Sequence, residues 1–172
     1  MENISKSLLI AGGVLIGILI ITLAVSLYAS LSTYVESAQE DMQTQKIQEF
    51  NVQFTKYINY NKETNEKDFT LTIQDIITAV NLAYENNTKY DLANYEEGNY
   101  YVTVNIMQGE DNPKYANLEK EINSKWTEIL ASELENKDEN GHVEIKEYKC
   151  SIDDVKFDSK TGRVYQIDFY EL

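Results

Sequence analysis

The chain has 172 residues with 29 acidic and 15 basic side chains, which give a formal net charge of -14 at pH 7. A chain this acidic repels nucleic acid and anionic lipid headgroups, so we expect no nucleic-acid partner. Its one cysteine, Cys150, excludes an intrachain disulfide.

The N-terminal region is dominated by an apolar run, because no charged residue occurs between Lys6 and Glu36. About 20 apolar residues in a helix cross the hydrocarbon core of a bilayer. We therefore predict a cytoplasmic tip and transmembrane anchor over residues 1–35. A cleaved signal peptide is the alternative, since small residues occur near position 30, but the run is longer than the apolar region of such peptides.

The orientation of the anchor follows from its flanking charges. Lys6 and the amino terminus precede the run, and the next basic residue is Lys46. Because cytoplasmic flanks carry the excess of basic residues, we expect a single-pass protein of the cell membrane with a cytoplasmic N-terminus. Residues 36–172 are then one extracytoplasmic domain, long enough for its own core.

Two small residues in the anchor, Gly13 and Gly17, form a GxxxG pattern. This spacing lets two membrane helices approach closely and predicts a helix-packing face. The alternative is that glycine is simply frequent in membrane helices. The sequence leaves both interpretations open.

The helical pattern continues past the anchor. No proline or glycine occurs over residues 18–57, and apolar side chains recur at three- and four-residue spacing. We therefore predict one helix from about Ser5 to Tyr57, in which residues 36–58 form a spine segment of the head. The apolar stripe consists of Leu27, Leu31, Tyr34, Ala38, Met42, Ile47, Phe50, Phe54 and Tyr57.

The first half of the head predicts a loop, a helix and a strand. Residues 59–68 are polar without periodicity and indicate a surface loop. Thr72 can cap a helix that ends near Asn86, with Asp75 as the capping-box acid. Residues 100–107 alternate between apolar and polar side chains and predict a strand.

The second half predicts a further helix and a terminal strand pair. Asn112 followed by Pro113 is a typical helix start, and an apolar stripe continues to Leu134. Residues 143–152 and 163–170 indicate two antiparallel strands joined by a turn. The predicted fold is α+β, with a long N-terminal helix and a small head of two further helices and an antiparallel sheet.

Catalytic chemistry has little support in the sequence. The single histidine, His142, lies beside a glycine in a predicted turn, and Cys150 lies in a predicted strand as a small buried side chain. The carboxylate pairs Asp153-Asp154 and Glu96-Glu97 are interpreted as solvated surface acids. These residues do not combine into a nucleophile, a base and an oxyanion donor, so we expect no enzyme and no catalytic residue.

One stretch approximates a calcium-binding loop. Residues 136–147 place oxygen-bearing side chains at the ligand positions of an EF-hand loop, with glycine at its sixth position. An asparagine occupies the first position, and a strand is predicted where the exit helix should follow, so an ordinary turn is favoured. We expect no cofactor, with calcium as the alternative. Its ligands would be Asn136, Asp138, Asn140 and Glu147.

Three segments carry a resemblance to known proteins: ISKSLLIAGGVLIGILIITL, FNVQFTKY and TIQDIITAVNLAYENN. Together they resemble a group of uncharacterised single-span surface proteins of low-GC Gram-positive bacteria, over about half of the chain. An N-terminal apolar helix that continues into a small α+β head also resembles the architecture of type IV pilins. The glutamate of the pilin processing motif is absent, since Ser7 and Leu8 open the run and no acid lies inside it.

The uncharacterised group implies no activity. From the apolar stripe that continues beyond the predicted anchor, we expect a non-enzymatic, membrane-anchored subunit of a pilin-like or secretion-like surface assembly. Its partners would be the membrane and either other proteins or further copies, which contact the anchor and the spine segment. The alternative is an anchored extracytoplasmic domain that binds a small ligand or a cation, as sensors do.

Overall fold

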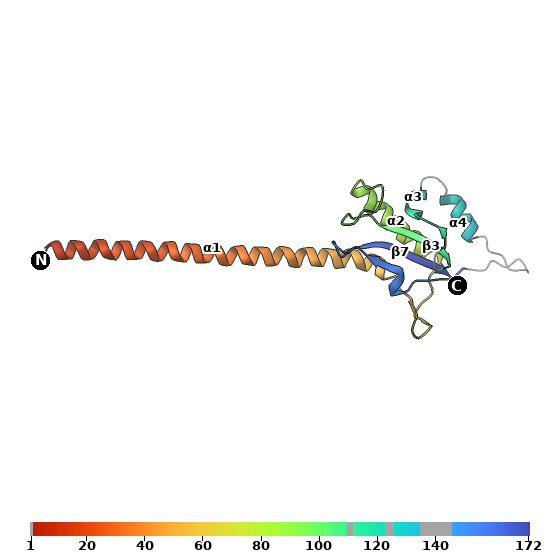
Figure 1. Cartoon of the computed structure of the whole chain (residues 1–172), viewed down its shortest axis with the longest axis horizontal. Helices are drawn as coiled ribbons and strands as arrows, with labels where there is room; N and C mark the ends of the chain where they lie inside the picture. Colours follow the sequence, from red (N-terminus) through yellow and green to blue (C-terminus); the bar gives the residue numbers. More distant parts are fainter. Residues whose placement is uncertain (1, 110–111, 123–125, 135–145) are drawn as a thin grey trace, which may run out of the picture. The chain divides into compact units, whose positions relative to one another are not determined.

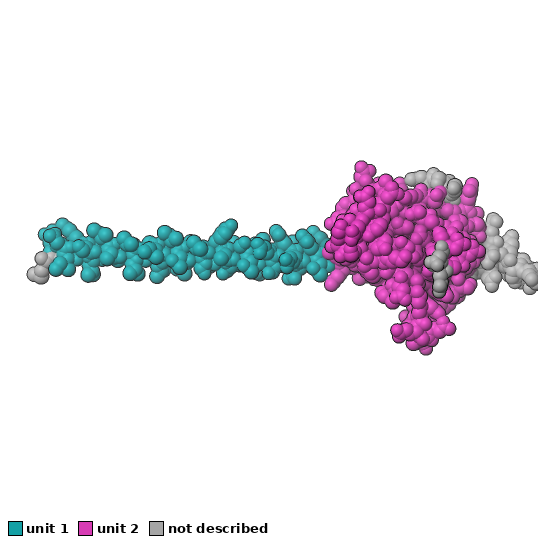
Figure 2. Space-filling model, in the orientation of Figure 1, with its two compact units in different colours: residues 1–46 teal, residues 47–172 magenta. Residues whose placement is uncertain are grey.

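The computed structural model describes residues 2–109, 112–122, 126–134 and 146–172 and has an α+β fold. The chain divides into two compact units, Met1–Lys46 and Ile47–Leu172 (Figure 2). The first unit lies in helix α1, Glu2–Thr55, which agrees closely with the predicted helix. The second unit, the head, contains the end of α1 and all other elements (Figure 1).

Every described residue of the first unit is exposed except Gly17, which is half-buried. Its apolar side chains are unburied; Leu9, for example, is 77% exposed. Helix α1 is long and apolar enough to cross a membrane. Apolar surface of this extent is unfavourable in water, so the helix is compatible with a membrane anchor.

The last turns of α1 belong to the core of the head. Phe54 is fully buried and Tyr57 nearly so, whereas residues 36–46 of the predicted spine segment are exposed. The ring centroids of Phe54 and Phe50 are 5.3 Å apart. The rings of Tyr57 and Phe169 pack edge to face, with their centroids 5.9 Å apart. The apolar residues at the end of α1 and directly after it are therefore part of the core of the head.

Helix α2, Ile73–Lys89, begins where the sequence predicts. The carboxylate of Asp75 accepts hydrogen bonds from the backbone N–H of Thr72 at 2.9 Å and from its hydroxyl at 3.0 Å. One face of the helix is buried, including Ile76 and Val80. The predicted capping acid thus holds the start of the helix in place.

The main sheet of the head is mixed, whereas the sequence predicted an antiparallel one. Strands β3, Thr103–Gly109, and β7, Val164–Glu171, pair in parallel at its centre. A parallel pair needs a long crossover, and residues between the two strands that include α3 and α4 provide it. The strand order is β4-β3-β7-β5, and β6 also pairs with β7. The short strands are β4, Asn112–Tyr115; β5, Tyr148–Lys149; and β6, Val155–Phe157.

The helix predicted from Asn112 is wrong in its first turns. Asn112–Tyr115 forms β4, which pairs antiparallel with β3 and places Pro113 opposite Met107. Strand β4 is at the edge of the sheet, which is where strands tolerate a proline. Helices α3, Leu118–Glu121, and α4, Trp126–Leu134, follow.

A small hairpin occupies the loop predicted over residues 59–68. It consists of β1, Tyr60–Asn61, and β2, Glu66–Lys67.

The core lies on one face of the sheet. The parallel register places Val104 beside Ile167 and Ile106 beside Phe169, and all four side chains are fully buried. Helices α2 and α3 contact β3, and α4 contacts α2 (Figure 1). Because side chains alternate along a strand, the opposite face carries polar partners such as Asn105 and Asp168.

Candidate functional site

Most of the predicted calcium loop lies outside the described residues. Asn136, Asp138 and Asn140 lie outside the described residues, as does His142. The carboxylate of Glu147 is described, and it forms an ion pair with Lys67 of β2. Among the described residues, no group of three or more histidine, cysteine or acidic side chains is arranged to hold a metal.

Of the predicted helix-packing residues in the first unit, Gly13 is exposed and Gly17 is half-buried. A Cβ atom added at either position would meet no other atom within 4 Å. The chain itself therefore leaves this face of the helix free, and helix packing through it stays a prediction.

Cys150 is a buried structural side chain, as the sequence predicted. It is fully buried, and burial raises the pKa of its thiol, with the carboxylates of Asp154 and Asp168 adding to the effect. Its backbone N–H donates to the Asn59 side-chain oxygen at 2.9 Å. A thiol in this state is protonated at neutral pH and a poor nucleophile.

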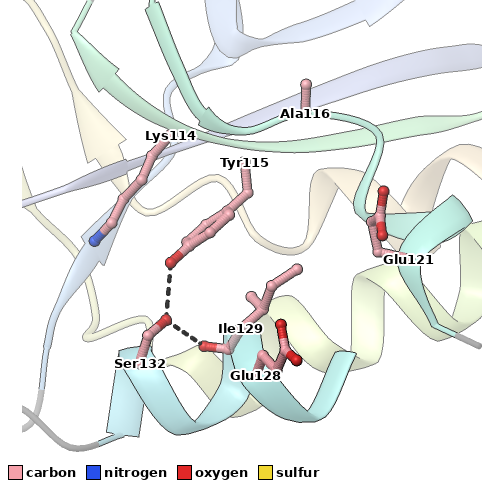
Figure 3. A pocket seen from close by; sticks show the side chains of 7 residues that line it. All are labelled: Lys114, Tyr115, Ala116, Glu121, Glu128, Ile129 and Ser132. Atoms are coloured by element: carbon pink, nitrogen blue, oxygen red, sulfur yellow. Dashed lines mark hydrogen bonds between the residues drawn. The ribbon is translucent and has the colours of Figure 1, made fainter. Parts of the chain in front are cut away.

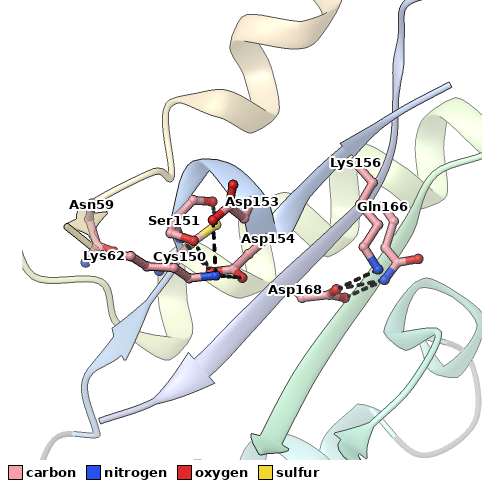
Figure 4. A network of polar contacts seen from close by, with 9 residues as sticks. All are labelled: Asn59, Lys62, Cys150, Ser151, Asp153, Asp154, Lys156, Gln166 and Asp168. Carbon is pink, nitrogen blue, oxygen red and sulfur yellow. Dashed lines mark hydrogen bonds and ion pairs between the residues drawn. The ribbon is translucent and has the colours of Figure 1, made fainter. Parts of the chain in front are cut away.

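Asp153 and Asp154 have different surroundings, although the sequence predicted two surface acids. Asp154 is buried and accepts hydrogen bonds from the Ser151 N–H at 2.8 Å and the Ser151 hydroxyl at 2.6 Å (Figure 4). Its other oxygen lies 3.1 Å from the Lys62 ammonium. Both aspartates lie in the 3-10 turn η1, Ile152–Asp154, where consecutive side chains point in different directions. The Asp154 side chain points into the protein, whereas 71% of the Asp153 side chain is exposed.

Asp168 is the centre of a second group of polar side chains, on the sheet face opposite the core (Figure 4). Its carboxylate accepts a hydrogen bond from Asn105 at 2.7 Å and a second from Gln166. The Lys156 ammonium lies 3.7 Å away. These donors satisfy a carboxylate that is only 3% exposed, which indicates a structural role.

The turn between β6 and β7 is organised by Asp158, which is also buried. Its carboxylate accepts hydrogen bonds from the backbone N–H groups of Gly98 at 2.8 Å and Thr161 at 2.7 Å, and from the Tyr95 hydroxyl at 2.9 Å. Burial alone would raise the pKa of Asp158, but these hydrogen bonds outweigh it and hold the pKa well below its usual range.

We expect Asp158→Asn to lower the free energy of unfolding by about 2 kcal/mol, because the amide nitrogen cannot accept the hydrogen bonds that one carboxylate oxygen receives. The stabilisation from Asp158 is present above its ordinary pKa of 3.8 and is lost as the pH falls through the lower value of the folded state. Urea unfolding at pH 7 and at pH 3 measures both effects. Asp153→Asn, at an exposed position, is the matched control and should change little.

An ion cluster joins α4 to the edge of the sheet. The Glu133 side chain is fully buried and lies 2.8 Å from the Lys114 ammonium and 3.1 Å from that of Lys146. Glu171 contacts the same two lysines at 2.9 and 3.3 Å. The Tyr148 hydroxyl donates to Glu133 at 2.6 Å. Two acids and two bases make the cluster neutral, and we infer that it fixes α4 on the sheet.

A hollow of about 450 Å³ lies between β4, α3 and α4 (Figure 3). Tyr115 projects into it from β4, and the Tyr115 hydroxyl lies 2.8 Å from that of Ser132 on α4. The volume falls within the range of small-ligand sites. The hollow is lined by Lys114, Tyr115, Ala116, Glu121, Glu128, Ile129 and Ser132.

This hollow is the candidate functional site of the head, and sequence reasoning did not find it. Its lining comes from β4, which was predicted as helix, and from two helices that were predicted as one. No protein-family model, curated protein or solved structure matches the chain. The function therefore has to be argued from the residues and their geometry.

Proposed function

We propose that the protein is a non-enzymatic, single-pass membrane protein that serves as a structural or accessory subunit of a pilin-like or secretion-like surface assembly. In this proposal the N-terminus is cytoplasmic and the head is extracytoplasmic. The partners are the membrane and further protein chains, which contact the exposed part of α1.

The observation that carries the proposal is the exposed apolar surface of the first unit. Apolar side chains such as Leu31, Tyr34 and Met42 follow the predicted span and are 61%, 71% and 55% exposed. Lipid can cover the residues within the bilayer, but the stripe extends beyond the length that a bilayer needs. A protein partner that packs against this stripe would remove it from water.

The non-enzymatic part of the proposal is supported by the state of the polar groups in the head. Cys150 is buried with a raised thiol pKa, and the carboxylates of Asp154, Asp158 and Asp168 are buried with hydrogen bonds from neighbouring groups. A catalytic acid or nucleophile has to reach a substrate. These groups instead hold loops and strands in place.

Disulfide crosslinking in membranes tests the assembly. In a Cys150→Ser background, single cysteines are introduced on the stripe at Leu31 and Ala38 and on the opposite face at Glu36 and Glu40. We expect oxidation to link stripe positions between chains and to leave the opposite face monomeric, because only packed faces bring two thiols within bonding distance. Gly13→Leu with Gly17→Leu should reduce crosslinking several-fold if the glycine face contributes to packing.

The same variants test orientation. A membrane-impermeant maleimide added to intact cells should label the Glu40→Cys variant if the head is extracytoplasmic. Equal crosslinking of both faces, or none at any of the four positions in native membranes, would contradict self-assembly. Protection of Glu40→Cys until the cells are lysed would contradict the proposed topology.

A further inference from the structure

The shape of the hollow beside β4 limits what it can hold. Its apolar surface consists of the Tyr115 ring, Ala116 and the side chain of Ile129, which is 8% exposed. Figure 3 shows the Tyr115 hydroxyl and Ser132 on one side of Ile129, and the carboxylates of Glu121 and Glu128 on the other. A ligand that fits has a short apolar body between two polar regions.

The hydroxyl groups in the hollow form a directed chain. Ser132 donates its hydroxyl hydrogen to the backbone oxygen of Ile129 at 2.8 Å. The hydrogen bond of 2.8 Å between Ser132 and Tyr115 is therefore donated by Tyr115. Both hydroxyl hydrogens are used within the protein, so the Tyr115 oxygen offers only lone pairs to a ligand.

The positive charge in the lining is already compensated. The Lys114 ammonium lies 2.8 Å from Glu133 and 2.9 Å from Glu171, which are part of the neutral ion cluster. Glu128 also lines the hollow and is exposed to solvent. Carboxylates accept hydrogen bonds and attract cations.

We propose that the hollow binds a primary ammonium group carried on a short aliphatic chain. The Tyr115 hydroxyl can only accept a hydrogen bond from a ligand, the charge of Lys114 is already compensated, and the carboxylate of Glu128 is exposed. The aliphatic chain packs on Tyr115 and Ile129. The ammonium group donates to Glu128 and, in a diamine, the second ammonium group donates to the Tyr115 oxygen. A free diamine and a lysine side chain of another protein both carry this chemistry.

The single tryptophan of the chain, Trp126, provides the readout, because it lies one helical turn before Ile129 on α4. Pentane-1,5-diamine and Nα-acetyl-lysine amide are titrated into the full-length protein in detergent, and tryptophan fluorescence is followed. We expect saturable binding of at least one of them. We also expect pentane-1,5-diol, which matches the diamine in shape but is uncharged, to bind at least tenfold more weakly.

Glu128→Gln should weaken binding about tenfold, because the glutamine side chain has no charge to attract the ammonium group and one of its two polar atoms cannot accept a hydrogen bond. Glu63→Gln, at an exposed position of the β1–β2 hairpin, removes the same charge far from the hollow and should leave affinity unchanged. Tighter binding of the diamine indicates a free amine as the source, and tighter binding of the lysine amide indicates a protein. Equal effects of the two variants, equal binding of the diol, or no saturable signal would overturn the proposal without affecting the assembly proposed above.

Discussion

Phe54→Ala is expected to lower the free energy of unfolding of the head by about 4 kcal/mol, the largest effect of any single substitution that we consider. Phe54 lies in the last turn of α1, is fully buried and packs within the core cluster of the head. Truncation removes most of an aromatic side chain and leaves a cavity that the surrounding side chains fill only in part. Urea unfolding of the full-length protein in detergent, followed by Trp126 fluorescence, measures the loss.

Val52→Ala is the matched control, because Val52 lies on the same helical turn but is 60% exposed. We expect it to change the free energy of unfolding by less than about 0.5 kcal/mol. Similar losses for Phe54→Ala and Val52→Ala would show that the end of α1 contributes helix propensity only. That result would contradict its role as part of the head.

Glu133→Gln should lower the free energy of unfolding by about 3 kcal/mol, because it leaves the ammonium groups of Lys114 and Lys146 with a single carboxylate, that of Glu171. Burial by itself would raise the pKa of Glu133, but hydrogen bonds from Lys114, Tyr148 and Lys146 outweigh it, and the pKa is lowered. The exposed Glu128→Gln variant on the same helix is the control, and we expect it to lower stability by less than about 0.5 kcal/mol.

The same cluster predicts how stability depends on pH. The pKa values of Glu133 and Glu171 are lowered from 4.5, so their contribution is complete above that pH and is lost as the pH falls through the folded-state values. The pKa of Lys114 is raised from 10.5, so its contribution is complete below that pH and is lost at more alkaline pH. Stability profiles of wild type and Glu133→Gln should therefore converge in acid. A constant difference down to pH 2 would contradict an electrostatic origin.

Features that depend on local chemistry could be predicted from the sequence. The continuation of α1 past the apolar run follows from the absence of proline and glycine over residues 18–57, and the start of α2 follows from Thr72 and its capping acid Asp75. The burial of Cys150 follows from its place among strand-forming residues. In each case the signal lies within a few residues of the feature, so long-range contacts were not needed.

Features that depend on long-range contacts could not be predicted. The residues 112–115 carry a helix-start signal, but antiparallel pairing with β3 overrides it and determines their structure. The parallel pairing of β3 with β7 has no local signal at all. The candidate site depends on both, since β4 supplies Tyr115 and Lys114, and the partners of Lys114 come from α4 and β7.

The position of β7 in the sheet constrains when the head can fold. This strand pairs with β3, about 60 residues earlier in the chain, and also with β5 and β6. Strand β7 is synthesised after the strands β3, β4, β5 and β6, so the core face formed by Ile167 and Phe169 stays open until β7 has left the ribosome. Contacts between such distant residues slow folding and leave apolar side chains exposed in the meantime. Until β7 is in place, β3 has no pairing that connects it to β5 and β6, so the sheet of the head lacks its centre.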